Sequence, residues 1–173
     1  MAAPEYIATV LQKYSVDRTR AEAAGQAIYP VLAKWGGKFL LKAEFSGSLS
    51  KSTAVNICTD ADIFLSLTST TPGTLRNNYE TLRNAVHQSG YPVRDQNVSI
   101  GTTVNGMKLD LVPGRRQSQH GNDHSLYKSK TDSWTMTNVN THINYVLTAH
   151  RTDEIKLVTV SYTHLTLPTT PYV

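Results

Sequence analysis

Two aspartates, Asp60 and Asp62, stand one residue apart at the start of an apolar run that includes Ile63 and Leu65. Side chains at positions i and i+2 of a strand point to the same face, so we expect both carboxylates on one face and the apolar residues on the other. Aspartate is depleted in strands, so its repetition here suggests a chemical role. Paired carboxylates on a rigid backbone are typical ligands of a Mg²⁺ ion that also holds substrate phosphates. The pair therefore predicts a divalent-metal site for phosphoryl transfer.

A third carboxylate, Asp110, belongs to a predicted hairpin. Asn105-Gly106 separates two alternating runs, residues 98–104 and 107–112, and Asn-Gly in this context favours a type I′ turn. The apolar residues of the second run share one face, and Asp110 points from the other. If this strand neighbours the first aspartate pair, three carboxylates converge, which is enough for two metal ions roughly 3.5–4 Å apart.

A Gly-Ser turn, Gly47-Ser48, precedes the aspartate pair, and residues 49–54 are expected to form a short helix. Backbone N–H groups at the start of a helix, together with the helix dipole, form a site for phosphate oxygens. Ser48 can serve as a phosphate ligand, as a plain helix cap, or as both. The segment is therefore interpreted as the phosphate-binding part of the same site.

Two helices are expected near the N-terminus, over residues 4–14 and 17–35, because their apolar residues recur at helical spacing. Asp17 can cap the second helix. Pro30 should kink this helix or split it in two, and a Gly-Gly pair should end it.

Strands are expected over residues 39–45 and 61–67. In the first strand Leu41, Ala43 and Phe45 should face the core, because every second residue of a strand lies on the same face.

An amphipathic helix should begin with Thr71 as N-cap and Pro72 at its first position, and Gly90 should stop it. Its predicted core stripe consists of Leu75, Tyr79, Leu82 and Val86. We expect residues 113–130 to form a polar loop and the rest of the chain to be helical.

The order of these motifs resembles a known superfamily. A GS turn, then KST, then DAD before apolar residues, and a later LDLVP are similar to the nucleotidyltransferases of the DNA polymerase β type. The likeness spans roughly residues 39 to 158. It is closest to the branch that holds oligoadenylate synthetases, class I CCA-adding enzymes and bacterial cyclic-oligonucleotide synthases. Ser52 and Val139 depart from the usual pattern, which has Gly and Pro at these positions.

The resemblance implies an α/β fold, a small mixed twisted sheet with flanking helices, and a helical C-terminal domain that is mostly missing. It implies transfer of a nucleoside monophosphate from an NTP to a hydroxyl, with a second nucleotide as the expected acceptor, as in bacterial anti-phage defence. Asp60 and Asp62 would hold both Mg²⁺ ions, or Mn²⁺ in their place, and Asp110 would complete the catalytic metal site. Gly47, Ser48 and Lys51 would grip the nucleotide phosphates.

Two alternatives remain open at this point. One is an RNA or tRNA end-adding nucleotidyltransferase, and the other is a nucleotide or RNA sensor that binds without turnover. Arg115 and Arg116 could meet phosphates or form a solvated basic turn. His120, Asp123 and His124 offer only a weak metal pattern, because no second ligand cluster accompanies them.

Composition is that of an ordinary soluble domain: 173 residues, 39% hydrophobic, with a net charge of +4 that favours polyanionic partners such as nucleotides or RNA. We expect one domain, no membrane partner and a cytoplasmic location, because no apolar run is long enough to span a bilayer and no secretory signal is evident. The lone cysteine, Cys58, fits a reducing compartment.

The final residues break the pattern. Residues 160–169 resemble the translation of a sequencing adapter, with a natural Thr-rich strand and loop as the alternative. We therefore expect a catalytic core with N-terminal helices and the start of the helical domain over residues 1–158, and a non-native tail over 159–173. A chain that ends this way is expected to be inactive and poorly soluble by itself, because one apolar face lacks its helical layer.

Overall fold

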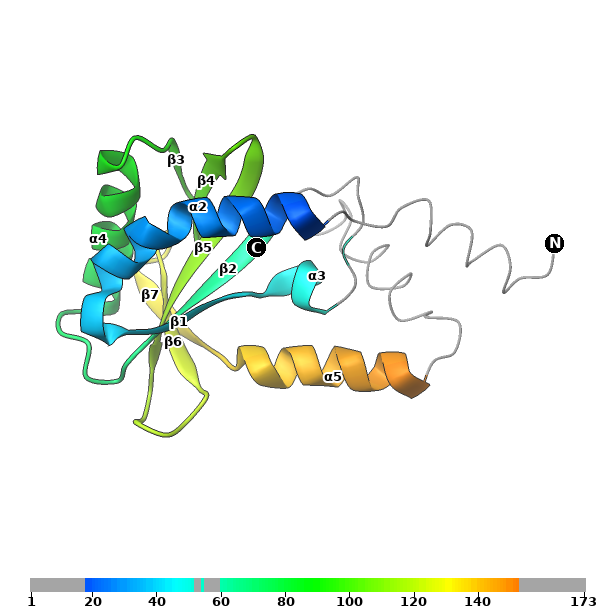
Figure 1. Ribbon diagram of the computed structural model, residues 1–173. Helices are drawn as coiled ribbons and strands as arrows, with labels where there is room; N and C mark the ends of the chain where they lie inside the picture. The colour runs from blue at the N-terminus through cyan, green and yellow to red at the C-terminus, as the bar shows by residue number, and fades with distance from the viewer. Residues whose placement is uncertain (1–17, 52–53, 55–59, 153–173) are drawn as a thin grey trace.

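The structure is a computed structural model that describes residues 18–51, 54 and 60–152 (Figure 1). Within these residues the chain forms a mixed sheet with flanking helices, which confirms the predicted α/β class. The helices are α2 (Arg18–Gly36), the 3₁₀ turn η1 (Gly37–Phe39), α3 (Gly47–Ser50), α4 (Leu75–Gln88) and α5 (Val139–Thr152). The strands are β1 (Leu40–Phe45), β2 (Asp60–Leu67), β3 (Val93–Asp95), β4 (Ile100–Val104), β5 (Met107–Arg116), β6 (His124–Lys128) and β7 (Ser133–Thr137).

The sheet has the strand order β1-β2-β5-β4-β3, and β6 and β7 extend it from the far part of β5. β2 and β5 run parallel, whereas the other strand pairs are antiparallel. The predicted hairpin is confirmed: β4 and β5 are joined by Asn105 at φ 51° and Gly106 at φ 75°. These left-handed conformations are those of a type I′ turn, which Asn-Gly adopts readily.

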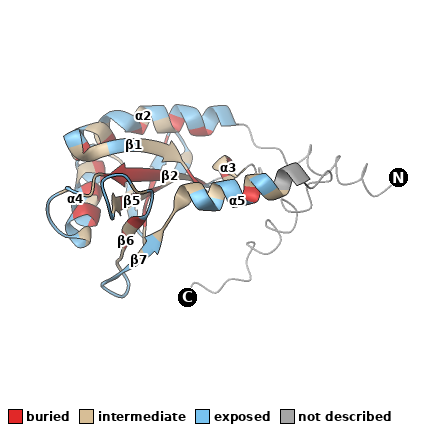
Figure 2. Cartoon of the chain, turned by 90° about the horizontal axis from the view of Figure 1, so that it is seen from below, coloured by how far each residue is buried: buried red, intermediate tan, exposed pale blue. Residues whose placement is uncertain are grey.

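One face of the sheet packs against α2 and α4 to form the core. Figure 2 shows β2 largely in the colour of buried residues, and its apolar side chains reach nearly complete burial. The predicted stripe of α4 is confirmed for Tyr79, Leu82 and Val86, which are buried, while Leu75 is only partly buried. Burial of this apolar face holds the strands in register, because a slip by one residue would turn all the apolar side chains of a strand toward solvent.

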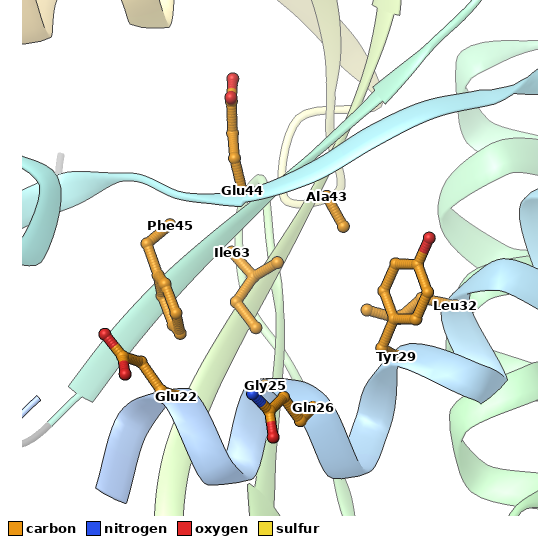
Figure 3. Close-up of a pocket in the computed structure, with 9 residues that line it drawn as sticks. All are labelled: Glu22, Gly25, Gln26, Tyr29, Leu32, Ala43, Glu44, Phe45 and Ile63. Carbon is orange, nitrogen blue, oxygen red and sulfur yellow. The ribbon is translucent and has the colours of Figure 1, made fainter. Parts of the chain in front are cut away.

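β1 departs from the simple alternation that the sequence predicts. Ala43 and Phe45 pack against the core, and Figure 3 shows Glu44 on the opposite side of the strand. The assignment of Leu41 to the core is wrong, because its side chain is 46% exposed. A register shift between Leu40 and Lys42 inserts an irregularity into the pairing with β2, so Leu40 takes the core position instead.

α2 runs through Pro30 without a break, so the helix is not split. Proline removes the hydrogen bond to the carbonyl of Gln26, but both residues are exposed and water can satisfy that carbonyl.

α4 begins later than predicted. Thr74 is the N-cap, because its hydroxyl oxygen accepts the Asn77 amide at 3.1 Å. Thr71 instead donates to the Thr68 carbonyl at 2.7 Å, which places it in the preceding turn.

The predicted polar loop over residues 113–130 is wrong in part. β5 continues through Pro113 and Gly114 to Arg116, and residues 124–128 form β6. Residues 133–137 form β7 where helix was expected, and helix α5 follows. These strands form because β6 pairs with β5 and β7 pairs with β6. Local composition does not reveal that pairing.

Several predictions lie outside the described residues: the helix over residues 4–14, Asp17, Ser52, Cys58 and the boundary between residues 158 and 159. In the described part of the chain, no helix combines the length and apolar character that crossing a membrane requires.

Gly114 gives a test of this packing. A Cβ at Gly114 would lie 2.5 Å from Phe64 Cζ and 3.1 Å from Leu126 Cδ2, although its backbone is not left-handed. Gly114→Ala should therefore lower the free energy of unfolding by about 1–3 kcal/mol through overpacking. Chemical denaturation should show a smaller loss in a Phe64→Leu background, where the neighbouring ring is absent. Equal losses in the two backgrounds would contradict the proposed contact.

Candidate functional site

The parallel pairing of β2 and β5 brings the predicted carboxylates together. Asp62 lies directly opposite Asp110, and Asp60 lies opposite Lys108. The three aspartates share one face of the sheet, since Asp60 and Asp62 are two residues apart and the apolar neighbours on both strands face the core. Burial increases along this face, from a 50% exposed Asp60 side chain to a 17% exposed Asp110 side chain. The predicted condition that the two strands be neighbours is confirmed.

The aspartates of the site repel one another, although Lys51, Lys108 and Arg94 offset part of their charge. Burial, as the largest cause, and the charges of Asp110 and Asp60 together raise the pKa of Asp62 to about 6, against a lowering contribution from Lys51. Burial also raises the pKa of Asp110, with a contribution from Asp60, against the hydrogen bond from Gln96. Like charges held close in a partly buried place favour the neutral forms. A divalent cation would relieve this repulsion.

The Gly-Ser turn reaches the same place. The Ser46 amide donates to the Asp62 carbonyl at 2.8 Å, which ties the start of α3 to β2. Gly47 has φ +61°, and a Cβ built on it would overlap the Asp62 carboxylate. Only glycine combines that left-handed backbone with such a close approach. Gly47 is thus required by the position of the carboxylate.

A small cavity of about 170 Å³ opens between α3, the aspartate face of β2 and the start of α5. Asp62, Gly47 and Lys51 line it, whereas Ser48 does not. The other lining residues are Ser46, Phe64, Val112, Leu126, Thr137, Val139 and His142. The structure therefore places a lysine and a carboxylate on the walls of one cavity, which suits a phosphate bound together with a cation.

A second cavity, of about 270 Å³, lies on the opposite side of the sheet between α2 and β1 (Figure 3). Ile63 lines this cavity, whereas the neighbouring Asp62 side chain lies on the other face. The three aspartates therefore do not contribute to it.

The donor set suits Mg²⁺, which prefers carboxylate oxygens. The carboxylates are turned toward protein partners, however: Asp60 Oδ1 lies 4.0 Å from Lys108 Nζ, and Asp110 Oδ1 accepts Gln96 Nε2 at 3.0 Å. In the described residues no three acidic, His or Cys side chains are gathered closely enough to hold a metal. The residues fit a divalent metal by type, charge and shared face. Ligation requires Asp60 to turn from Lys108, and its half-exposed side chain has room to do so.

The basic pair beyond Asp110 lies away from this cluster. Arg115 pairs with Leu67 at the opposite end of β2 from Asp60, and its Nη1 donates to the Gly73 carbonyl at 2.8 Å. It anchors the loop before α4. Arg116 donates to the Gln119 carbonyl at 3.4 Å. Among the described residues, the contacts of both arginines therefore lie away from the three aspartates.

His124 is a structural residue. Its Nδ1 donates to the Asn122 carbonyl and its Nε2 accepts from the Ser66 hydroxyl, both at 2.8 Å. Its ring packs edge-on against Phe64 at 4.9 Å between centroids. Because both nitrogens are used and the ring is buried, this histidine is not a metal ligand here.

Sequence reasoning missed Gln96 and His142. Gln96 contacts Asp110 from the segment between β3 and β4, and His142 lines the cavity from α5. Neither belongs to a recognisable motif. Their only signal is proximity in space, which the sequence does not contain.

No protein-family model matches the chain, and a search of curated proteins gives no significant match. Solved structures match it. CdnC of E. coli MS115-1, determined with ATP, is 19% identical with a TM-score of 0.66, and the match covers 93% of this chain and 57% of CdnC. CdnG, a CD-NTase of Bradyrhizobium diazoefficiens in complex with GTP, is 14% identical with a TM-score of 0.70, over 82% of this chain and 45% of CdnG. The chain has the nucleotidyltransferase fold.

A third match extends this fold likeness. The CdnE c-UMP-AMP synthase of Rhodothermus marinus is 13% identical with a TM-score of 0.64, over 88% of this chain and 66% of that protein. The chain spans about half the length of the CdnC and CdnG structures. At these identities the comparison establishes the nucleotidyltransferase fold, and the chemistry must be argued from the residues of this chain.

The electrostatic strain at Asp62 predicts an unusual mutational effect. Its folded pKa of about 6 lies above the ordinary value of 3.8, so the charged form destabilises the metal-free protein at pH values above about 6. Asp62→Asn should therefore stabilise the metal-free chain at pH 8, by roughly 3 kcal/mol at most for a shift of about two units. The gain should shrink to a small remainder as the pH falls from 6 to 4, and it should vanish below the ordinary value of 3.8, where Asp62 is protonated in both states.

Denaturation with a chelator present, at pH 8 and pH 4, measures this difference. Asp95→Asn is the matched control, because Asp95 is exposed and pairs with Arg83 at 2.7 Å. The free energy of unfolding of this control should fall by about 0.2–1 kcal/mol and should not rise. A destabilised Asp62→Asn variant at pH 8 would show that the carboxylate is not under repulsion.

Proposed function

We propose that this chain is the catalytic part of a metal-dependent nucleotidyltransferase that moves a nucleoside monophosphate from an NTP to a hydroxyl. The observation that carries the proposal is the register of Asp62 opposite Asp110 beside the Gly47 turn. Carboxylates on neighbouring strands next to a cavity of about 170 Å³ that Lys51 helps to line suit phosphoryl transfer. The matched structures include a c-UMP-AMP synthase, so we propose a second nucleotide as acceptor and a cyclic or linear oligonucleotide as product, with a role in antiviral defence.

Each residue has a separate role in this proposal. Asp60 and Asp62 would hold the Mg²⁺ or Mn²⁺ ions, and Asp110 would complete the site and orient the acceptor hydroxyl for loss of its proton. Gly47 lets the backbone approach the phosphates, Ser48 is proposed as a further phosphate ligand, and Lys51 offsets phosphate charge. The metal, when bound, neutralises charge on the phosphates and lowers the pKa of a bound hydroxyl. The protein contributes chiefly positioning and charge complementarity.

The activity, substrates and partners belong to the whole protein. Because the chain covers about half of the matched CdnC and CdnG structures, we propose that residues 1–158 form the catalytic core and the start of a helical domain. Turnover should accordingly be measured on a polypeptide that carries the natural downstream sequence, while metal and nucleotide binding can be measured on either polypeptide. The cytoplasmic location stays a prediction.

An RNA end-adding transferase is the second candidate, because it would use the same three carboxylates. Product analysis separates the two. Incubation with NTP and Mg²⁺ alone should give pyrophosphate and short or cyclic oligonucleotides, whereas an end-adding enzyme should extend an added RNA. A non-catalytic sensor would release no pyrophosphate under either condition, and that result would refute the proposed function.

Nucleotide binding should depend on the β2 pair. Asp60→Asn and Asp62→Asn each keep the side-chain volume but remove a ligand charge, so each should abolish Mg²⁺-dependent ATP binding while the chain stays folded. Isothermal calorimetry measures this effect, and circular dichroism checks the fold. Asp95→Asn should bind as the wild type does, because Asp95 lies outside the site and pairs with Arg83. Unchanged Mg·ATP affinity in both site variants would remove them from the metal site.

Asp110 should behave differently. Its proposed role concerns the acceptor, so Asp110→Asn should lower kcat steeply while much of the NTP affinity remains. Steady-state pyrophosphate release and equilibrium nucleotide binding together measure this separation. A kcat within about threefold of wild type corresponds to less than roughly 0.7 kcal/mol of barrier and would exclude Asp110 from the mechanism.

A further inference from the structure

Asp110 is held by its neighbours more firmly than the other two aspartates. Gln96 Nε2 donates to Asp110 Oδ1 at 3.0 Å, and Arg94 Nη2 lies 3.8 Å from the same oxygen. Within the described part of the chain, the hydrogen bond and the ion pair recorded for this carboxylate both fall on Oδ1. One oxygen is therefore fixed by the protein, and Oδ2 is left for a cation or an acceptor hydroxyl.

The backbone of Gln96 is itself fixed by a partly buried network of hydrogen bonds. Its carbonyl accepts the Tyr79 hydroxyl at 2.9 Å and the Ser129 hydroxyl at 2.7 Å. Its amide donates to the Ser99 carbonyl at 3.1 Å. Tyr79 is 3% exposed and belongs to the core stripe of α4. The turn that carries Gln96 is thereby attached to the hydrophobic core, and its position does not depend on Asp110.

The orientation of the Gln96 side chain is also determined. The Ser99 hydroxyl donates to Gln96 Oε1, and a carboxylate can only accept, so the amide nitrogen must face Asp110. Gly101 provides the necessary space. A Cβ at Gly101 would lie 3.2 Å from Gln96 Nε2 and 3.1 Å from Arg94 Nε. A larger residue on β4 would crowd both side chains that reach Asp110.

We propose that Gln96 is a positioning residue for Asp110, which rests on the proposed function of the carboxylates. Through its amide it holds Oδ1 in place and leaves Oδ2 to face the cation. Residues that orient a metal ligand in this way commonly change metal affinity or activity 10- to 100-fold when they are removed. Ser99 acts on Asp110 indirectly, because its hydroxyl fixes the side-chain amide of Gln96, which in turn holds Asp110.

A purely structural role for Gln96 makes a different prediction. Its bonds to Tyr79, Ser129 and the Ser99 carbonyl use backbone atoms and persist when the side chain is changed. Gln96→Met keeps the length of the side chain and removes only the contacts to Asp110 and the Ser99 hydroxyl. Stability and metal affinity can therefore be separated in this variant.

The test uses Mn²⁺ alone, titrated into the wild-type chain and its variants and followed by electron paramagnetic resonance. Gln96→Met should bind Mn²⁺ roughly 10- to 100-fold more weakly, with a melting temperature close to that of wild type. Ser99→Ala should show a smaller loss in the same direction. Gln117→Met is the matched control, because the Gln117 side chain donates to the Ser125 hydroxyl in an exposed bond of 3.3 Å, and this variant should bind Mn²⁺ as the wild type does.

The outcomes are distinguishable. The metal site stands if the wild type binds Mn²⁺ and Asp62→Asn abolishes that binding. If folded Gln96→Met and Ser99→Ala then bind Mn²⁺ as tightly as the wild type, the positioning role is overturned and the proposed function stands. If Gln96→Met fails to fold, Ser99→Ala decides alone, because it leaves Gln96 in place. If the wild type binds no Mn²⁺, or if Asp62→Asn binds it equally well, the metal site and the positioning role both fall.

Discussion

The parallel pairing of β2 with β5 is the interaction on which the candidate site depends. It sets Asp62 beside Asp110 and at the same time sets Ala61 beside Leu109 on the opposite face. Both apolar residues are completely buried against the helices. The core and the site are thus two faces of one pair of strands. A shift in register that separated the carboxylates would also expose the core, so hydrophobic burial fixes the geometry of the charged face.

That geometry has an electrostatic cost. Burial and the nearby charges of Asp110 and Asp60 raise the pKa of Asp62 to about 6, and Lys51 offsets only part of this effect. A fold under no functional constraint would place such residues apart or replace one of them. Departures from the most stable arrangement are expected at functional sites, where charge is held ready for a ligand. The close approach of Gly47 to Asp62 adds to this crowding.

The surroundings of the three aspartates are unequal in a way that suits their proposed roles. Asp60 is half exposed and faces Lys108 across 4.0 Å, so its side chain can turn to a ligand. Asp110 is largely buried and is held by Gln96, whose turn is anchored in the core through Tyr79. In the proposed metal site, a half-exposed carboxylate on one strand and a held one on its neighbour would let a cation enter and then be kept in a defined position. The rigid partner is supported by the same core that sets the strand register.

Parts of the chain that were predicted correctly share a local origin. The β4–β5 hairpin follows from Asn105-Gly106 and from alternation on either side, which depend on neighbouring residues alone. The common face of Asp60 and Asp62 follows from the two-residue period of a strand. The errors have a different origin. Leu41 is exposed because the pairing of β1 with β2 contains an irregularity, and residues 124–128 form a strand because β5 and β7 lie on either side of them.

The sequence by itself determined which residues could do chemistry, since residue type, strand period and turn conformation are local properties. Tertiary structure alone decided that β2 and β5 are neighbours, that Arg115 points to the loop before α4, and that Gln96 reaches Asp110. These are contacts between segments far apart along the chain. They depend on how the whole apolar face is buried, and no window of neighbouring residues carries that information.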